Sequence, residues 1–351
     1  MVKMNKTVII TGILGQDGSN LAEYLLSNTN HKVIGVFKRG SNPNTENIKS
    51  IVSNTKFYLV PGDITDQTSM DSLVSSHHPD YFINFAANSF VGTSWDTPDQ
   101  VFSVNTLGVL KCLESIRKFR PECRFYSAGS SEEFGDIKFI PQNEDHPIVP
   151  VSPYGVAKAA ARYMVDVYRR SYGLFVIHGT LFNHEGPKRG TEFVTRKITK
   201  NIARILKDIE QGNAIKPFKL GNVYASKDWS DSRDMVRGIW MMLKQNSPNE
   251  YLLASGKTRT IIDFVESAFA SQGIVGKWNS CSDPLKETYT ATVAENTVTL
   301  VEIDQSLYRP TEVGIQCGDS SAAKKALGWE PEISFDEMIK DMIDYDKNSI
   351  S

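Results

Sequence analysis

The sequence is poor in the features that mark secreted, membrane-bound or metal-containing proteins. It has four cysteines, and no two of them have the close spacing of a zinc or redox motif. No apolar run approaches the length of a transmembrane helix, and no signal peptide precedes the first strand-like run. We therefore expect no metal centre, no membrane partner and a cytoplasmic location.

An excess of charge of one sign is also missing. The chain of 351 residues carries 39 Lys and Arg against 41 Asp and Glu, which leaves a net charge of -2. A protein that binds nucleic acid or an anionic membrane usually shows a basic excess, so neither is expected as a partner. A phosphate-bearing ligand would have to be met by a local group of cations.

Apolar, β-rich runs alternate with helical stretches through the first half of the chain. The runs are residues 8–10, 33–37, 57–60, 81–85 and 124–127, and the helical stretches are residues 21–26 and 100–118. The runs are continuous rather than alternating, as in strands that are buried on both faces. This order predicts an α/β fold with a doubly wound parallel sheet of the Rossmann type.

The second half is less regular. Helical patterns at residues 194–211, 232–244, 261–271 and 335–345 are separated by long irregular segments. We predict a sheet domain over residues 1–182 and a smaller, mostly helical lobe over residues 183–351. The boundary is expected to be discontinuous, with the chain returning to the sheet.

A glycine-rich loop follows the first predicted strand. Glycines stand at positions 12, 15 and 18, between a strand and a helix. Such glycines permit a tight turn and a close approach of the backbone to a pyrophosphate, and the helix N-terminus then offers free N–H groups. The loop predicts a dinucleotide site, although three glycines can also build a simple turn.

The end of the second predicted strand indicates which dinucleotide. An NAD site usually places a carboxylate there, for the ribose hydroxyl. This chain has Lys38 and Arg39 instead. Cations can pair with a 2′-phosphate, so the pattern favours NADP. A solvated basic turn is the alternative.

Tyr154 and Lys158 form a Tyr-x-x-x-Lys pair on one face of a predicted helix. Ser152 and Pro153 supply an N-cap and a first-turn proline for that helix. A nearby ammonium lowers the pKa of a phenol, which would let Tyr154 act as a base. Upstream, a strand ends just before Ser130 and Glu132, which add a hydroxyl and a carboxylate. A surface Tyr and a solvated Lys are the alternative reading of the pair.

These motifs together resemble the extended short-chain dehydrogenase/reductases. Segments 181–190, 193–199, 220–222, 227–229 and 308–313 further resemble the GDP-mannose 4,6-dehydratase family. The resemblance runs from residue 7 to about residue 345 and is weakest between residues 273 and 300.

The resemblance implies an NADP-dependent lyase that dehydrates a GDP-linked hexose. Tyr154 would take the proton of the 4-hydroxyl, Glu132 would remove the C5 proton, and water would leave from C6. It implies a homodimer or homotetramer that takes part in deoxysugar biosynthesis.

The implied catalytic residues are Ser130, Glu132, Tyr154 and Lys158. The implied cofactor residues are Gly12, Gly15, Gln16, Asp17, Gly18, Lys38, Arg39, Asp63, Ile64, Ala86, Tyr154, Lys158 and His184. The implied substrate residues are Ser89, Ser130, Asn183, Val194, Lys197, Lys227, Arg309 and Glu312.

Several positions depart from the family pattern. Ser130 replaces a Thr but keeps the hydroxyl. Asn20, Asn88, Phe90, Val151 and Lys227 stand where the family has other residues. These changes are expected to touch the sugar side of the site, so the identity of the sugar is open, with a heptose as the alternative to mannose.

Two other functions remain open. A reductase or epimerase of the same fold would use Tyr154 and Lys158 without needing Glu132. A non-catalytic nucleotide-sugar binding protein would need none of them. If Glu132 is not the base, Glu133 is the next candidate.

Overall fold

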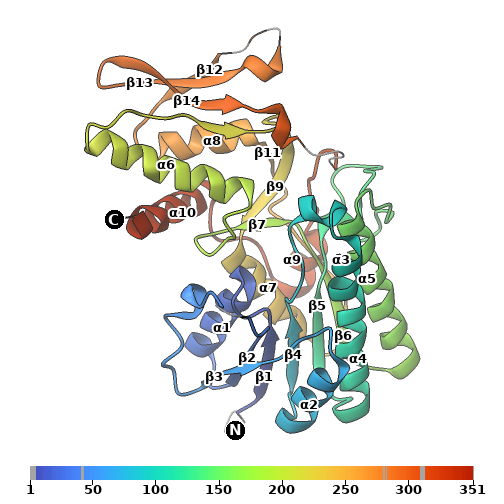
Figure 1. The fold of residues 1–351 in the computed structure, drawn as a ribbon. Coiled ribbons are helices and arrows are strands. Elements are labelled where there is room, and N and C mark those ends of the chain that lie inside the picture. Colours follow the sequence, from blue (N-terminus) through green and yellow to red (C-terminus); the bar gives the residue numbers. More distant parts are fainter. Residues whose placement is uncertain (1–4, 41–42, 280, 282, 309–312, 351) are drawn as a thin grey trace.

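The largest sheet of the molecule is parallel throughout and confirms the predicted doubly wound fold (Figure 1). The computed structural model describes residues 5–40, 43–279, 281, 283–308 and 313–350. The strand order is β10-β6-β5-β4-β1-β2-β3. The strands are β1 Thr7–Thr11, β2 Lys32–Phe37, β3 Phe57–Pro61, β4 Tyr81–Asn84, β5 Arg124–Ala128, β6 Val176–Leu181 and β10 Leu252–Leu253. The order grows outward from β1 in both directions, so a ligand crevice is expected between the carboxyl ends of β1 and β4.

Helices bury both faces of this sheet. Helices α1 (Gln16–Asn28) and α7 (Ser232–Leu243) cover one face, and α2 (Gln67–His77), α4 (Gly108–Phe119) and α5 (Pro153–Tyr172) cover the other. Ile10 packs in the first core and its neighbour Ile9 in the second, and both are fully buried. Alternate residues of β1 therefore enter different cores, which explains why its apolar run is continuous.

The helical stretch expected at residues 100–118 contains a π-helical turn. The turn spans Ser103–Leu107, between α3 (Pro98–Phe102) and α4. Asn105 lies in it and holds the backbone of Asn88 from both sides. Its Oδ1 accepts from the Asn88 N–H at 2.9 Å, and its Nδ2 donates to the Asn88 carbonyl at 3.1 Å. The turn thus fixes the loop that follows β4, and π turns often occur next to functional sites.

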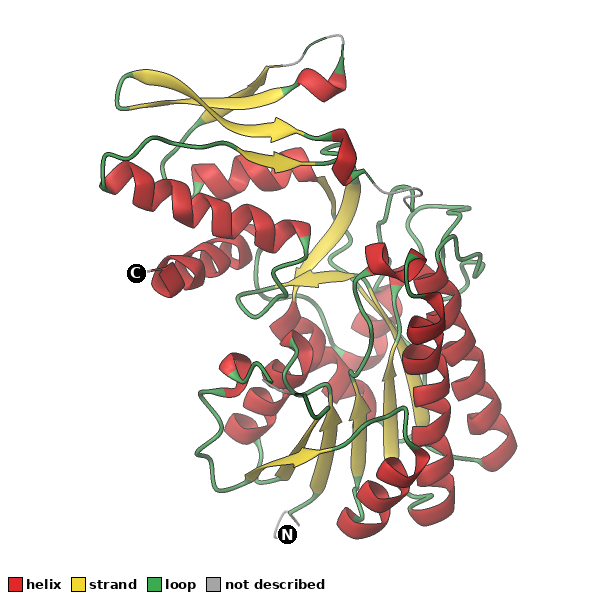
Figure 2. Ribbon diagram, viewed as in Figure 1, coloured by secondary structure: helices red, strands yellow, loops and turns green. Residues whose placement is uncertain are grey.

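The C-terminal lobe lies beyond the carboxyl ends of the parallel strands (Figure 2). Its helices are α6 Val194–Glu210, α8 Ile261–Ala270 and α10 Phe335–Ile350. Two small sheets accompany them, in the orders β12-β13-β14-β8 and β11-β9-β7. The strands are β7 Asn183–Glu185, β8 Phe218–Leu220, β9 Ser226–Asp231, β11 Thr258–Thr260, β12 Gly276–Asn279, β13 Thr288–Val293 and β14 Asn296–Ile303. Thr alternates with Tyr, Ala and Val along β13, a period-2 pattern that is typical of strands.

The second half of the chain returns to the large sheet. β10 pairs with β6 in parallel, and Met235 and Trp240 of α7 lie in the core under β1. After α9 (Ser321–Leu327), the buried Trp329 joins the same core, and its indole N–H donates to the Asp234 carbonyl at 2.9 Å. The division at residue 182 stays a prediction, and segments beyond it belong to the packing of both halves.

Candidate active site

A cavity of about 800 Å³ opens at the carboxyl ends of the parallel strands, between the sheet and the C-terminal lobe. Its volume is in the range of ligand sites. Most of the residues predicted for the site line it. They are Gly12, Gly15, Gln16, Asp17, Gly18, Lys38, Asp63, Ile64, Ala86, Ser89, Ser130, Glu132, Tyr154, Lys158, Asn183, His184, Val194 and Lys227. Arg39 and Lys197 do not line it, and Arg309 and Glu312 lie outside the described residues.

The glycine loop leaves no room for side chains. Gly12 has a φ of +70°, and a Cβ there would lie 2.8 Å from the backbone of Phe85 and Ala86. A Cβ on Gly18 would lie 2.4 Å from the carbonyl oxygen of Gly12. Helix α1 begins at Gln16 with Gly15 as its N-cap, and no described side chain caps it. Gly15, Gln16, Asp17 and Gly18 line the cavity, so the first N–H groups of α1 lie at its wall, where an anionic group can bind.

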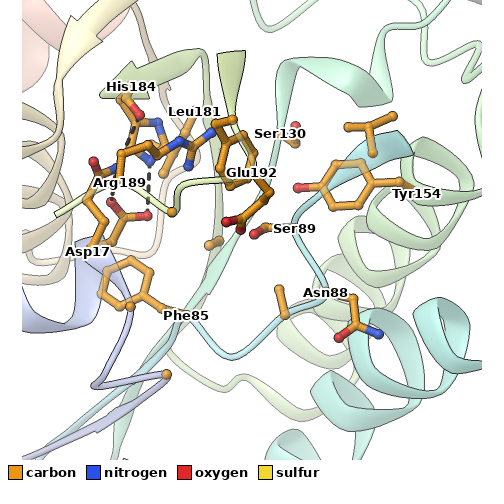
Figure 3. Close-up of a pocket in the computed structure, with 18 of the residues that line it drawn as sticks. Asp17, Phe85, Asn88, Ser89, Ser130, Tyr154, Leu181, His184, Arg189 and Glu192 are labelled. Atoms are coloured by element: carbon orange, nitrogen blue, oxygen red, sulfur yellow. Dashed lines mark hydrogen bonds and ion pairs between the residues drawn. The ribbon is translucent and has the colours of Figure 1, made fainter. Parts of the chain in front are cut away.

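Asp17 and His184 join the start of α1 to β7 (Figure 3). His184 Nε2 lies 3.0 Å from Asp17 Oδ2, and its Nδ1 lies 2.7 Å from the Phe182 carbonyl. Both ring nitrogens face acceptors, which favours the imidazolium form. Burial alone would lower the pKa of His184, but the Asp17 carboxylate outweighs it and the pKa is raised. Burial likewise opposes ionisation of Asp17, yet His184 holds its pKa below the ordinary value.

Lys38 does not stand alone at the end of β2. Its ammonium lies 3.0 Å from a carboxylate oxygen of Asp63, and its side chain is largely exposed. Burial would raise the pKa of Asp63, but hydrogen bonds from Thr65 and Lys38 outweigh it and the pKa lies below the ordinary value. A ligand phosphate at Lys38 would therefore share that cation with Asp63.

Tyr154 and Lys158 are both buried on α5, whose N-terminus starts as predicted. The Ser152 hydroxyl accepts from the Gly155 N–H at 3.0 Å. Lys158 Nζ donates to the Ala128 carbonyl at 2.8 Å and lies 5.8 Å from the centre of the Tyr154 ring. Burial lowers the pKa of Lys158 to about 8.

The pKa of Tyr154 differs from the expectation. Burial raises it above the ordinary value, because a buried phenolate loses hydration. A hydrogen bond with Ser130 opposes this rise but does not outweigh it, and the charge of Glu132 adds to it. Spacing on a helix can predict that Tyr154 and Lys158 lie near each other, but not how strongly the site excludes water.

Ser130 and Glu132 follow β5. Ser130 is the N-cap of a short 3-10 turn over Ser131–Glu133, and Glu132 lies within that turn. The Ser130 hydroxyl accepts from the Glu132 N–H at 3.2 Å. The side chain of Glu132 lines the cavity with Tyr154 and is 9% exposed as a residue. The ammonium of Lys227, on β9, lies 3.9 Å from Glu132 Oε1.

Glu133 points away from the cavity and is fully buried. Its Oε1 accepts from the Ser130 N–H at 2.7 Å and lies 2.9 Å from His178 Nε2. Arg162 is 3.8 Å from its other oxygen. Burial would raise the pKa of Glu133, but His178 and Arg162 outweigh it and hold the pKa low. This geometry makes Glu133 a support for the Ser130 backbone and argues against its use as a base.

Arg189, Glu192 and Phe193 also line the cavity, although they are not among the predicted site residues. The Arg189 guanidinium stacks 3.4 Å from the Phe193 ring centre, and Phe90 packs edge-on against the same ring at 5.6 Å. In Figure 3, Arg189 lies on the side of Asp17 and His184, and Glu192 lies between Arg189 and Tyr154. The only sequence signal for these residues is that they lie between two predicted site residues, His184 and Val194. Position along the chain does not show which side chains turn toward the cavity.

The departures from the family pattern are spread more widely than expected. Asn88 and Lys227 line the cavity, but Asn20, Phe90 and Val151 do not. Asn20 instead donates to the Ser232 hydroxyl at 2.7 Å and links α1 to α7. The expectation that these changes gather on the sugar side therefore holds for Asn88 and Lys227, whereas Phe90 reaches the site only through its contact with Phe193.

The described part of the chain offers neither a membrane span nor a metal site. Within the residues that the structure describes, no helix is long and apolar enough to cross a bilayer. In the same part of the chain, no group of three or more His, Cys, Asp or Glu residues could hold a metal ion.

Several solved structures share this fold. UDP-glucose 4-epimerase from Thermotoga maritima, solved with UDP-glucose, matches with a TM-score of 0.80 at 22% identity, over 98% of this chain and 100% of its own. dTDP-glucose 4,6-dehydratase from Bacillus anthracis, in complex with NAD, matches with a TM-score of 0.78 at 21% identity, over 98% and 97% of the two chains. At this identity the likeness establishes the fold.

Sequence comparison identifies the family. The family model described as GDP-mannose 4,6 dehydratase matches residues 9–342. GDP-mannose 4,6-dehydratase from Vibrio cholerae is 38% identical over 353 residues, which cover 97% of this chain and 93% of that protein. The human GDP-mannose 4,6 dehydratase is 35% identical over 354 residues, with 99% and 92% covered. The chain belongs to the GDP-mannose 4,6-dehydratase family.

Proposed function

We propose that this protein is an NADP-dependent GDP-mannose 4,6-dehydratase that forms GDP-4-keto-6-deoxy-mannose. The observation that carries the proposal is the position of Glu132, a carboxylate in the same cavity as Tyr154 and Ser130. A reductase or a 4-epimerase needs the Tyr and Lys pair but has no use for a base at C5. Family membership supports the same reaction.

The cavity suits a dinucleotide at its sheet end. The glycine loop has no side chains that would keep a pyrophosphate away from the backbone. The N-terminus of α1, which has no side-chain cap, offers N–H donors to the same pyrophosphate. Lys38 is the cation for a 2′-phosphate, with Arg39 exposed beside it. NADP, when bound, accepts a hydride from C4 of the sugar and returns it to C6.

The protein side chains manage the protons. Tyr154 takes the proton of the 4-hydroxyl, and Ser130 hydrogen-bonds the same oxygen. The 4-ketone acidifies the C5 hydrogen, which Glu132 then removes as a proton. The 6-hydroxyl leaves as water. Glu132 gives the proton that it took to the departing 6-hydroxyl, and C5 takes up a proton once the hydride reaches C6, so one water is lost overall. The 4-ketone stays in the product. Because the pKa of Tyr154 is raised, its phenol firmly holds the proton that it takes from the 4-hydroxyl.

The nucleotide is proposed to lie against the C-terminal lobe. Asn183 lines the cavity, and its side-chain oxygen is buried and has no protein partner among the described residues, so it suits a ligand donor. Val194 opens α6 at the same wall. Lys197, Arg309 and Glu312 remain predicted contacts of the GDP group.

Product analysis after incubation with GDP-mannose tests the function directly. NMR should show a 4-keto-6-deoxy sugar without net consumption of added NADPH. A reductase would consume NADPH in proportion to product, and a binding protein would form no product. Parallel reactions with GDP-heptose and with UDP- and dTDP-sugars test the sugar and the base separately. Turnover of UDP- or dTDP-sugars alone would contradict the GDP assignment.

We further propose a homodimer formed through α5 and its neighbours. Val156, Tyr163 and Val167 lie on one face of α5 and are about half exposed, and Leu107 is exposed on the adjoining segment. An apolar row of this kind suits a helix-to-helix interface between copies. Light scattering of wild type and Tyr163→Asp would test it, since a dimer should dissociate in the variant. Equal masses would contradict this interface.

The cytoplasmic location stays a prediction. The four cysteines are free thiols, and Cys112 and Cys123 are buried, which suits a reducing compartment. Cell fractionation would test it.

A further inference from the structure

Gln316 reaches the proposed base from the far end of the chain. Its amide Nε2 lies 3.4 Å from Glu132 Oε1, across 184 positions of sequence. Gln316 is 1% exposed. It does not line the cavity and therefore stands behind Glu132 as seen from the ligand side. A carboxylate only accepts hydrogen bonds, so the amide nitrogen must be the group that faces it.

The backbone around Gln316 is held on both sides. Gln142, which is fully buried, donates from Nε2 to the Ile315 carbonyl at 3.0 Å and accepts from the Cys317 N–H at 2.8 Å. Thr258 donates its hydroxyl hydrogen to the Gln316 carbonyl at 2.9 Å. A residue fixed in this way can impose an orientation on its partner, because its own position is already determined.

Gln316 and Lys227 contact the same oxygen. The Lys227 ammonium lies 3.9 Å from Glu132 Oε1, and the Gln316 amide lies on that oxygen as well. One hydrogen bond from Gln316 and the nearby charge of Lys227, both at the same carboxylate oxygen, favour one rotation of the carboxylate plane. The second oxygen, Oε2, is then the one that can be turned toward a sugar.

Gln316 differs from Lys227 in one chemical respect. An ammonium can only donate, so it suits the carboxylate form of Glu132 alone. An amide also carries an acceptor, and Gln316 Oε1 is buried without a protein partner among the described residues. After Glu132 has taken a proton it can donate, and a flipped amide could then accept from it. Gln316 therefore suits both protonation states of the base.

We propose that Gln316 is a positioning residue for Glu132, which orients its Oε2 toward the C5 hydrogen of the sugar. This inference rests on the proposed function, in which Glu132 takes the C5 proton. It predicts that loss of the amide slows the elimination and leaves the earlier oxidation at C4 unchanged, because that oxidation depends on Tyr154 and Ser130 rather than on the orientation of Glu132.

Single-turnover kinetics can separate the two steps. Enzyme loaded with NADP is mixed with GDP-mannose, or with whichever nucleotide sugar the wild type converts. The near-ultraviolet absorbance of NADPH rises as C4 is oxidised and falls as the hydride returns. For Gln316→Met, which keeps the volume and removes the amide, the rise should match wild type. The fall should be roughly tenfold slower, the scale expected for one lost hydrogen bond to a charged group. The steady-state kcat should fall with little change in KM.

Controls make the result decisive. Cys317→Ala alters the adjacent residue without touching Glu132 and should behave as wild type. Gln316→Asn keeps an amide but shortens its reach, so it should show the same slow fall in NADPH absorbance. It serves as the second variant if Gln316→Met does not fold. In a Glu132→Gln background, Gln316→Met should add nothing, because the group that it positions is gone.

The opposite results would overturn the proposal. Equal slowing of the rise and the fall would mean a general structural role, and an unchanged fall would mean that Glu132 needs no such support. Wild-type enzyme that converts no GDP-mannose would contradict the proposed substrate. In that case the rates of the NADPH rise and fall in the variants would be measured with the nucleotide sugar that the wild type does convert, and they would still test the role of Gln316.

Discussion

The two sides of the cavity are built in different ways. The sheet side comes from loops that each follow a parallel strand, with Gly12 after β1, Lys38 after β2 and Ser130 after β5. The lobe side gathers residues from separate segments, such as Arg189, Lys227 and, behind Glu132, Gln316. The carboxyl ends of parallel strands lie at one edge of the sheet, so the positions of these loops do not depend on how the lobe is built. The second side depends on how the lobe packs, which makes it the natural place for changes in substrate specificity.

Removal of the Tyr154 hydroxyl should have the largest effect on activity, because this group of the sheet side takes the proton of the sugar 4-hydroxyl. Tyr154→Phe should lower kcat by roughly a thousandfold, within the usual range for a lost acid–base group. Its binding of NADP, measured by fluorescence titration, should stay near wild type. Tyr172→Phe, an exposed position at the end of the same helix, serves as the control. A Phe variant that keeps substantial activity would move the base elsewhere.

Glu132→Gln should separate the oxidation at C4 from the elimination that follows it. Oxidation at C4 should survive, while product formation falls by roughly a hundredfold or more. Bound NADPH should therefore accumulate after substrate is added, without a 6-deoxy product. Glu133→Gln is the matched comparison at the next position, and it should reduce stability because Glu133 is buried against His178. Full turnover by Glu132→Gln would exclude it as the base.

Measuring the preference for NADP over NAD tests the proposed contact of Lys38 and Arg39 with the 2′-phosphate on the sheet side. Replacement of both Lys38 and Arg39 by Ala should weaken NADP binding by roughly tenfold to several hundredfold and leave NAD binding nearly unchanged. Lys49→Ala removes an exposed cation elsewhere on the surface and should change neither affinity. Calorimetric titration of both dinucleotides would measure the preference. Equal affinity of the wild type for NAD and NADP would refute the assignment.

The smallest effect is expected at the Asp17–His184 pair, which joins the two sides. The pKa of His184 is raised above 6.5, so its stabilisation is fully present below that value and is lost as pH rises through the folded-state pKa. The pKa of Asp17 is lowered below 3.8, so its contribution is present above that value and is lost as pH falls through its folded-state pKa. Both contributions coexist between these limits.

Thermal unfolding of the protein against pH would measure this linkage. Wild type should lose stability relative to His184→Gln as pH rises above about 6.5, because the variant carries no titrating imidazole. His77→Gln changes a histidine whose pKa is lowered rather than raised, and it should not reproduce the effect. Parallel curves for wild type and His184→Gln would show that the pair contributes nothing to this dependence.

Local signals predict the sheet side of the site well. The continuous apolar runs identify buried parallel strands, and the carboxyl ends of such strands hold the ligand site, so the sequence alone places Gly12, Ser130 and Tyr154 in it. The prediction fails where local pattern carries no orientation. It expects residues 88–90 to face the sugar, but Phe90 does not line the cavity although Asn88 and Ser89 do.

The sequence by itself determined the fold class, the dinucleotide loop and the Tyr154–Lys158 pair, because each depends on periodicity or spacing within a few turns of chain. Only the tertiary structure decided that Glu133 turns inward to His178 while Glu132 turns to the cavity. It also decided that Gln316 meets Glu132 and that burial, rather than Lys158, governs the pKa of Tyr154. Contacts between distant segments and the exclusion of water arise when the lobe packs over the sheet, and neither leaves a mark at one place in the sequence.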